Sequence, residues 1–504
     1  MPKKVIIIGA GIGGLSAGCY AQMNGYRVHI FEKHYAPGGL CTSWSRHGFT
    51  FDGCIHNLAG TAPDSSFAAM WRELGITARM HAFKEMIAVE APDGDASLTM
   101  LTNLEDLEAA LTRQFPVDAA EIRSLIRAAR KMAAADLLGL ALAPMLERVR
   151  AIMVLASLSN IGRLTLEQYA QRFVDPHLRA AFPRIIYDWP RQSMFMALHF
   201  LARLHKGDLG WPMGGSGAFA RSIAERLKQL GGEITYNAAV TEVIVENNRA
   251  VGVRLQDGRE HRAGIVISNA YGPTVLDMTP AKYAPAALRR RYEKPEDRIE
   301  MGVHVSFGVK RTLLEEPHAI VFPLEPAVEI DGEIRNRLFI QTFGHDPAMA
   351  PPGKGVIKVL LSTSWARWKE LSLSPRRYQE EQDRIAAIVL GVLERRFPGI
   401  SADVEVTDVA TPMTTKRFTG VGPGFGLSIG EFLGGVLLGQ NAGRTLPGLK
   451  NFYMVGQWAG APGVPMVAAM GRELVREICK RDGRKFVTLQ PSPAPAAAAW
   501  RGAA

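Results

Sequence analysis

Three glycines near the amino terminus constrain the fold more than any other feature of the chain. An apolar run at residues 5–8 is followed by Gly9, Gly11 and Gly14, which have the spacing G-x-G-x-x-G. Gly9 permits a tight turn, Gly11 lets the backbone approach a pyrophosphate, and Gly14 allows a helix to pack closely on a sheet. The spacing alone occurs in proteins that bind either NAD or FAD.

The residues after the glycines supply the context that this motif requires. Residues 15–23 have a helical period, and residues 27–32 read as a second strand that ends at Glu32, where a ribose-binding carboxylate is expected. The alternative is a secretory signal or membrane anchor, because two lysines precede a long uncharged run. Such segments do not need this glycine spacing, so we predict a β-α-β unit whose helix N-terminus faces phosphates.

Composition limits the classes of protein that fit this start. The chain has 504 residues, of which 47% are hydrophobic and 21% charged, so two or three globular domains are expected. Its four cysteines lack zinc-ligand spacing, which predicts no metal site and a reduced, cytoplasmic setting. The formal charge of +10 fits acidic lipids, a phosphorylated cofactor or solubility. No zinc-finger or RNA-recognition motif is present, so no nucleic-acid partner is expected.

The sequence pattern changes several times along the chain. A mostly helical, Met-rich region starts near residue 77, and a Gly-rich turn, a helix and a β-meander start near residue 207. Residues 487–504 have the Pro/Ala composition of a disordered tail. The predicted segments are 1–76, the first FAD-binding segment; 77–206, a helical lid; 207–272, the second FAD-binding segment; 273–406, a substrate region; 407–486, the third FAD-binding segment; and 487–504, the tail.

Three further features favour FAD over NAD. A second close-approach turn, Pro37-Gly38-Gly39, follows soon after Glu32. The meander AAVTEVIVENNRAVGVRLQDG lies far from the first β-α-β unit, and the late stretch NFYMVGQ is an apolar strand that ends at a glycine and precedes a helix.

These motifs together resemble the phytoene desaturase superfamily of FAD-dependent oxidoreductases, in particular its carotenoid isomerase and retinol saturase branch. The matching stretches are EKHYAPGGLCTSWSRHGFTFDGCIHNLAG, GWPMGGSGAFARSIAERL, ATPMTTKRFTG and NFYMVGQWAGAPGVPMVAAMGREL. The resemblance implies an α/β fold: a discontinuous, Rossmann-like FAD-binding domain with a helical insertion and a mixed α+β substrate region.

The resemblance also implies which residues contact FAD. The first three glycines would hold the pyrophosphate, Glu32 the adenosine ribose, and Val240 the adenine region through its backbone. Gly456 and Gln457 would reach the ribityl and phosphate, and residues 464–466 the flavin ring. The expected contact residues are Gly9, Gly11, Gly14, Glu32, Gly38, Gly39, Leu40, Val240, Gly456, Gln457, Val464, Pro465 and Met466.

Two positions depart from the wider amine-oxidase pattern. Leu40 and Cys41 follow the second Gly-Gly pair, where many relatives have an arginine. Gln457 stands where many relatives have an aspartate. Both departures argue against a polar-amine oxidase.

Because a flavin itself carries the hydride, the protein needs few catalytic groups. His56 is the best catalytic candidate, since the resemblance places its loop near the flavin; a structural histidine that fixes the loop is the alternative. Cys41 and Cys54 could lie near the flavin or be small buried residues. Arg417 could steer a polar substrate end or stabilise a loop. His304 and Trp365, expected on β-runs, could line a pocket or be ordinary core positions.

The function expected from the resemblance is redox chemistry on carbon–carbon bonds of an apolar polyene, carotenoid- or retinoid-like. Desaturation, saturation and redox-assisted isomerisation stay open, as does NAD(P)H as a transient electron donor. The alternative is a flavin oxidase that tailors a smaller secondary metabolite with oxygen as acceptor. A lipid substrate would come from a membrane, so peripheral contact with the membrane inner face is a further hypothesis. The oligomeric state stays open.

Overall fold

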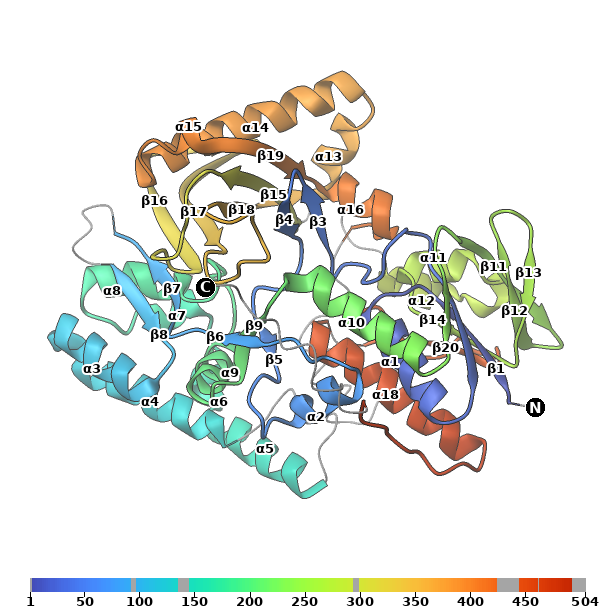
Figure 1. The fold of residues 1–504 in the computed structure, drawn as a ribbon. Coiled ribbons are helices and arrows are strands. Elements are labelled where there is room, and N and C mark those ends of the chain that lie inside the picture. Colours follow the sequence, from blue (N-terminus) through green and yellow to red (C-terminus); the bar gives the residue numbers. More distant parts are fainter. Residues whose placement is uncertain are drawn as a thin grey trace.

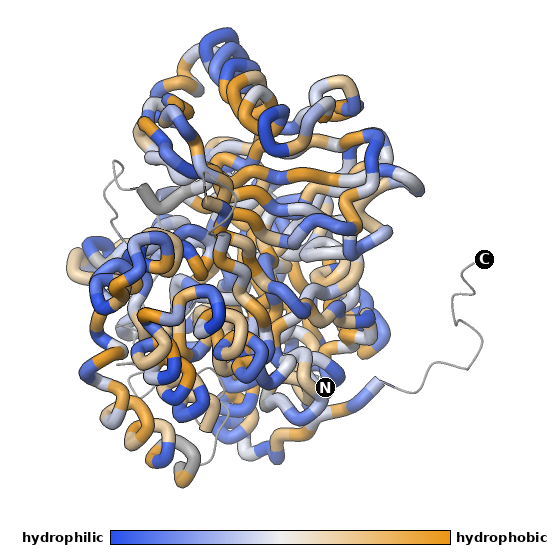
Figure 2. Tube along the Cα trace, turned by 90° about the vertical axis from the view of Figure 1, so that its left-hand side faces the viewer, coloured by the Kyte–Doolittle hydropathy of each residue, from blue (hydrophilic) through white to orange (hydrophobic). Residues whose placement is uncertain are grey.

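The computed structural model describes residues 2–91, 97–134, 145–292, 299–423, 444–460 and 462–491. A parallel sheet with its covering elements lies on one side of the molecule, and a larger sheet covered by α13, α14 and α15 lies on the other (Figure 1). The helices α3 to α9 lie beneath the larger sheet. Orange, hydrophobic segments run along the central strands in Figure 2.

The parallel sheet contains five strands in the order β10-β2-β1-β14-β20. Alternate residues of β1 face two apolar layers: Val5 and Ile7 pack with the helices α1, α10 and α18, whereas Ile6 and Ile8 pack with the meander. Burial on both faces explains why β1 is a continuous apolar run. The elements are β1 (Lys4–Ile8), β2 (Arg27–Phe31), β10 (Glu233–Thr235), β14 (Ile265–Ser268), β20 (Phe452–Met454), α1 (Ile12–Met23), α10 (Gly215–Gln229) and α18 (Val464–Arg481).

The meander is antiparallel, in the order β11-β12-β13. Its strands are β11 (Val240–Glu246), β12 (Arg249–Leu255) and β13 (Glu260–Arg262). Asn247 and Asn248 both have positive φ, 48° and 58°, as the tight turn of a two-residue hairpin requires. The predicted hairpin turns at 247–248 and 257–258 are therefore confirmed.

The larger sheet has seven strands in the order β19-β15-β18-β17-β16-β7-β8. On one face Val303, Val305 and Phe307 pack against α14, and this leaves His304 and Ser306 on the opposite face. The elements are β7 (Glu85–Val89), β8 (Leu98–Leu101), β15 (Ile299–Val309), β16 (Ala319–Ile330), β17 (Glu333–Thr342), β18 (Gly355–Ser364), β19 (Val404–Ala410), α13 (Trp365–Leu371), α14 (Pro375–Arg396), α15 (Ile400–Asp403) and α16 (Pro412–Thr419).

The helical pattern expected from residue 77 begins only at Leu104. Residues 80–82, 85–89 and 98–101 are strands, and two of these extend the larger sheet. Apolar runs this short cannot be assigned by periodicity alone. The helices that follow are α3 (Leu104–Gln114), α4 (Ala119–Ala133), α5 (Met145–Ser157), α6 (Ser159–Gly162), α7 (Leu166–Ala170), α8 (Pro176–Ala181) and α9 (Met194–His205).

Smaller elements connect the two sheets. They are β3 (Ser43–Arg46), β4 (Phe49–Asp52), β5 (Leu58–Ala59), β6 (Met80–Ala82), β9 (Leu209–Pro212), α2 (Ser66–Glu73), α11 (Gly272–Asp277) and α12 (Ala286–Tyr292). The loop between β4 and β5, residues 53–57, carries His56.

The segment predicted as a disordered tail begins with residues that contact the body of the protein. The backbone N–H of Val487 donates to Asn24 Oδ1 at 2.8 Å, and Arg226 donates to the carbonyl of Leu489 at 2.8 Å. Residues 492–504 lie outside the described part of the chain. Within the described ranges no helix is long and apolar enough to cross a membrane.

Candidate functional site

The glycine turns predicted to hold a pyrophosphate meet at the carboxyl edge of the parallel sheet. Gly9, with a φ of 95°, follows β1, and the N–H of Gly38 donates to the carbonyl of Ala10 at 2.9 Å. Gly11 and Gly38 form an isolated parallel bridge. The two Gly-rich turns of the first segment therefore lie side by side, where open α/β sheets bind their ligands.

The turns leave no room for side chains. A Cβ at Gly14 would lie 2.3 Å from the carbonyl oxygen of Gly9, and one at Gly38 would lie 2.2 Å from that of Cys41. A Cβ at Gly456 would lie 2.6 Å from Oδ1 of Asn269. The helix α1 begins directly at the first of these turns, and the backbone N–H groups of its first turn are the donor set that a diphosphate needs.

Glu32 lies directly after β2, beside the first turn. Its carboxylate accepts from the N–H of Ala10 at 2.6 Å and of His34 at 2.8 Å. Burial raises its pKa, although these bonds oppose the shift. The carbonyl of Glu32 accepts from Ala238 at 2.8 Å, which brings the meander start at Val240 to the same corner. This geometry fits a ribose on Glu32 and an adenine near Val240.

The late segment brings its predicted residues to the same edge. Gly456, with a φ of 93°, follows β20, and Gln457 Nε2 is buried without a hydrogen-bond partner in the structure. An orphaned buried donor indicates a missing acceptor. A Cβ at Gly39 would lie 3.4 Å from Gly11 Cα, and Leu40 packs against the meander core.

The helix α18 begins at Val464 after Gly463, with Pro465 and Met466 buried in its first turn. Its N-terminus carries partial positive charge, which suits a reduced flavin. α18 crosses α1 closely, since a Cβ at Gly471 would lie 2.7 Å from the carbonyl oxygen of Gly13. The residues that were predicted to contact FAD in segments 1–76, 207–272 and 407–486 therefore have an arrangement that fits this cofactor.

Asn269 is a residue that the sequence reasoning missed. It follows β14, and its side chain lies among the glycine turns: a Cβ at Gly11 would lie 2.4 Å from its Nδ2, and one at Gly13 would lie 2.8 Å from its Oδ1. One feature of the sequence could have identified it: Asn269 is a polar residue directly after the apolar run VIS, and a residue that follows a parallel strand lies at the same sheet edge as Gly9.

His56, in the connecting loop, faces the larger sheet. Its Nδ1 is 3.0 Å from Oε1 of Gln341 on β17. Burial lowers the pKa of His56 well below its usual value, and the charge of Lys358 lowers it further, so the ring is neutral at pH 7. Tyr187, Trp189 and Phe339 surround the ring, with centroid distances of 4.9, 6.4 and 6.2 Å. A neutral imidazole in an aromatic wall is thus the central feature of this side of the site.

The loop that carries His56 is fixed by a buried pair that the sequence did not indicate. Asp52 accepts from the N–H and hydroxyl of Ser216 at 2.6 and 2.8 Å, at the start of α10. The ammonium of Lys358 on β18, 1% exposed, donates to the carbonyl of Asp52 at 3.0 Å. Burial lowers the pKa of Lys358 to about 8. Asp52, directly before the loop, is therefore bonded both to α10 and to the larger sheet.

Two of the other candidates lie beside His56: Cys54 is in the same loop, and Cys41 Sγ donates to the carbonyl of Ser216 at 3.8 Å. Cys41 and Cys54 are free thiols that hydrogen-bond to each other, which together with burial raises the pKa of Cys41. Arg417 lies on the helix α16, not in a loop, with its guanidinium over Phe418.

His304 and Trp365 were both expected on strands. His304 lies on β15 with Nδ1 unpartnered. The expectation for Trp365 was wrong: its backbone begins α13, because Ser364 caps that helix through a bond to the N–H of Arg367 at 3.3 Å.

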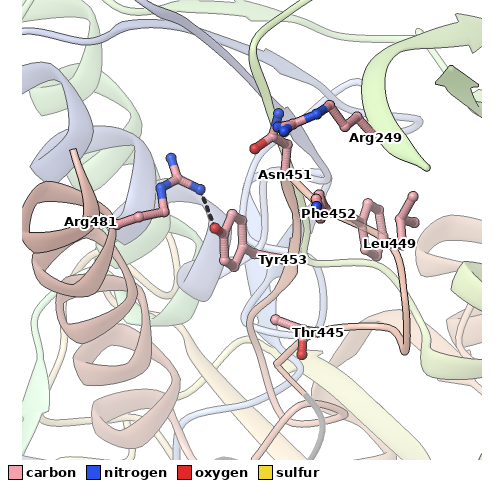
Figure 3. Close-up of a pocket in the computed structure, with 8 residues that line it drawn as sticks. Arg249, Thr445, Leu449, Asn451, Phe452, Tyr453 and Arg481 are labelled. Carbon is pink, nitrogen blue, oxygen red and sulfur yellow. Dashed lines mark hydrogen bonds between the residues drawn. The ribbon is translucent and has the colours of Figure 1, made fainter. Parts of the chain in front are cut away.

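A surface pocket of about 250 Å³ lies at the opposite edge of the parallel sheet. Arg249, Asn451 and Tyr453 line it, and Arg481 donates to the hydroxyl of Tyr453 (Figure 3). It adjoins the amino end of β20, whereas the turn at Gly456 follows the carboxyl end of that strand.

Comparisons with known proteins agree with this geometry. A model of the family described as flavin containing amine oxidoreductase matches residues 12–470. The chain is 26% identical to prolycopene isomerase of Arabidopsis thaliana, over 82% of this chain and 72% of the relative. It is 27% identical to the lycopene-forming phytoene desaturase of Pseudescherichia vulneris, over 94% and 99%.

Solved structures show the same fold at lower identity. An oxidoreductase from Methanosarcina mazei has a TM-score of 0.61 at 19% identity, covering 94% of this chain and all of the other. Reduced UDP-galactopyranose mutase has a TM-score of 0.57 at 15% identity, with 95% and 96% covered.

The chain belongs to the flavin-containing amine oxidoreductase family, and it is an FAD-dependent oxidoreductase. The resemblance to the phytoene desaturase and carotenoid isomerase flavoproteins is confirmed, as is the α/β fold with its Rossmann-like sheet.

Proposed function

We propose that this protein desaturates a long, apolar polyene. The observation that carries the proposal is His56, a neutral imidazole set in a wall of aromatic rings. The carotenoid desaturases and isomerases among its relatives support this substrate class over a small secondary metabolite.

Desaturation removes a hydride from one carbon and a proton from its neighbour. FAD, when bound at the glycine turns, supplies the hydride acceptor. His56 accepts the proton at Nε2, and its low pKa keeps that nitrogen free at pH 7. Tyr187, Trp189 and Phe339 hold the polyene and exclude water by apolar contact.

The predicted segments differ in whether they bind FAD or the substrate. We propose that 1–76, 207–272 and 407–486 hold FAD, and that 77–206 and 273–406 hold the substrate. The strands β7 and β8 belong to segment 77–206, but they lie in the same seven-stranded sheet as the strands of segment 273–406. This shared sheet supports assigning both segments to the substrate.

The proposal is tested by incubating the FAD-loaded protein with phytoene or with prolycopene, in the presence of a quinone as electron acceptor. Desaturation lengthens the conjugated system and moves its absorbance to longer wavelength. Isomerisation without added double bonds would contradict the desaturase proposal and favour an isomerase. Saturation that depends on NAD(P)H would contradict it as well and favour a saturase. Peroxide formed with a small polar substrate would favour the oxidase alternative.

Replacing His56 by glutamine is expected to lower kcat by about 10²–10⁴-fold, because a positioned proton acceptor contributes that much. The FAD content and the absorbance of bound flavin should not change. Turnover rates are measured with saturating polyene, and His177→Gln, on the remote helix α8, is the matched control. If the His56→Gln protein has the kcat of the wild type, His56 is not the proton acceptor and has only a structural role.

We further propose peripheral contact with the inner face of a membrane, through α5. Leu146, Val149, Ile152 and Met153 are exposed there, and at about 100° per residue they occupy one third of the helix circumference. The neighbouring α4 adds exposed cations, including Arg127. An apolar face flanked by cations suits an acidic lipid surface.

The double variant Leu146→Gln, Met153→Gln is expected to lower binding to acidic liposomes by about 100-fold, since burial of each side chain contributes about 1.5 kcal/mol or more and every 1.4 kcal/mol is a factor of ten. Binding is measured by flotation at low salt. Ile334→Gln, which removes an 81% exposed isoleucine on β17, is the control and should bind as wild type does. Equal binding by all three proteins would remove α5 from the contact.

A further inference from the structure

The hydrogen bonds around His56 determine which ring nitrogen carries its proton. His56 Nδ1 faces Gln341 Oε1 at 3.0 Å, and Gln341 Nε2 faces His318 Nε2 at 3.3 Å. His318 Nδ1 faces the carbonyl of Thr342 at 2.8 Å. Gln341 and Thr342 are fully buried and His318 is 3% exposed, so water does not compete for these groups.

The assignment starts at Thr342, because a carbonyl can only accept. His318 must therefore carry its proton on Nδ1. Burial lowers the pKa of His318 to about 4, so the ring is neutral and its Nε2 is an acceptor. The carbonyl of His56 lies 3.3 Å from the same Nε2, but the shorter contact to Thr342 decides the tautomer.

The same logic then passes through Gln341. Its amide nitrogen donates to His318 Nε2, which directs its oxygen to His56. A flipped amide would need a proton on both nitrogens of His318, hence a buried cation. His56 must therefore carry its proton on Nδ1, and among the described residues no group hydrogen-bonds to its Nε2.

We infer that Gln341 and His318 are positioning residues that fix His56 in the Nδ1–H tautomer and keep Nε2 free as the proton acceptor. This role rests on the proposed function, in which Nε2 takes the substrate proton. Lys358 on β18, His304 on β15 and His318, which directly precedes β16, are the charged or titratable groups that face His56. Each disfavours a positive charge on its ring, so Nε2 is unprotonated before turnover and the imidazolium formed when it accepts the substrate proton must lose that proton again before the next turnover. The second nitrogen of a catalytic histidine is commonly fixed by such a bond.

The test is ¹⁵N NMR of histidine-labelled holoprotein, with the His56 signals assigned by their loss in His56→Gln. Wild type is expected to show a protonated Nδ1 and an unprotonated Nε2 from pH 6 to pH 8. Gln341→Met removes the acceptor, so Nε2–H should appear and kcat should fall about tenfold to hundredfold with KM unchanged. Gln341→Glu still accepts from Nδ1 and should retain the wild-type tautomer. Gln382→Met, on α14, is the control.

A protonated Nε2 in wild type, or an unchanged tautomer in Gln341→Met, would overturn the inference. If Gln341→Met does not fold, the tautomers of His56 in the wild type and in Gln341→Glu still test the inference, because both are expected to carry the proton on Nδ1. The spectra need no polyene. They therefore test the tautomer of His56 independently of whether the protein desaturates a polyene.

Discussion

Gly14→Ala is expected to weaken FAD binding at least about 100-fold, a loss of about 2.7 kcal/mol. The added Cβ would lie 2.3 Å from the carbonyl oxygen of Gly9, and neither backbone can move without opening the turn that we propose cradles the diphosphate. FAD content is measured by absorbance after gel filtration, and the dissociation constant by fluorescence titration of the apoprotein.

The matched control is Gly391→Ala in α14, where a Cβ would meet no atom within 4 Å. It should retain FAD and gain about 0.5–1 kcal/mol in stability, because alanine is the better helix former. Stoichiometric FAD in purified Gly14→Ala protein would contradict the assignment of this turn to the cofactor.

Lowering the pH from 7 to 5 is expected to reduce the free energy of unfolding by roughly 4–6 kcal/mol. Burial lowers the pKa values of His304, His318 and His345 to about 3, 4 and 2. The unfolded chain binds a proton at each near pH 6.5, before the folded protein does. Stability from this source is therefore full above pH 6.5 and is lost as the pH falls, by about 2 kcal/mol per histidine at pH 5.

Asp52 acts with the opposite sign, because burial raises its pKa and the folded state gains its proton first. The pH dependence is measured by urea unfolding at several pH values. His304→Gln should lower the proton uptake on unfolding at pH 5 by about one. A free energy of unfolding that is constant from pH 7 to pH 5 would contradict the neutral, buried state of these rings.

Local sequence signals predicted the cofactor side of the molecule well. The first β-α-β unit, the meander and the final strand and helix lie where their patterns placed them, because each pattern reports a nearby turn or period. The strands at 80–101 were missed, since their partners lie in the distant strands β9 and β16 or in each other, and pairing across sequence has no local signature.

The substrate side was harder to predict for the same reason. His56 was identified by its loop, but its partners Gln341 and His318 lie 285 and 262 residues away. Lys358 stands in an apolar strand, where only the fold reveals that its ammonium reaches the carbonyl of Asp52. Asn269 is likewise an ordinary residue in sequence, and its place between the glycine turns at 9–14 and at 456 comes from the strand order.

The most direct test of the central claim is the flavin absorbance of the purified protein under anaerobic conditions, before and after a hydrocarbon polyene is added. We predict an oxidised FAD band that bleaches as the polyene gains a double bond, with no nicotinamide present. An absent band after reconstitution with FAD, or a band that bleaches only with NADPH and never with the polyene, would contradict the desaturase proposal.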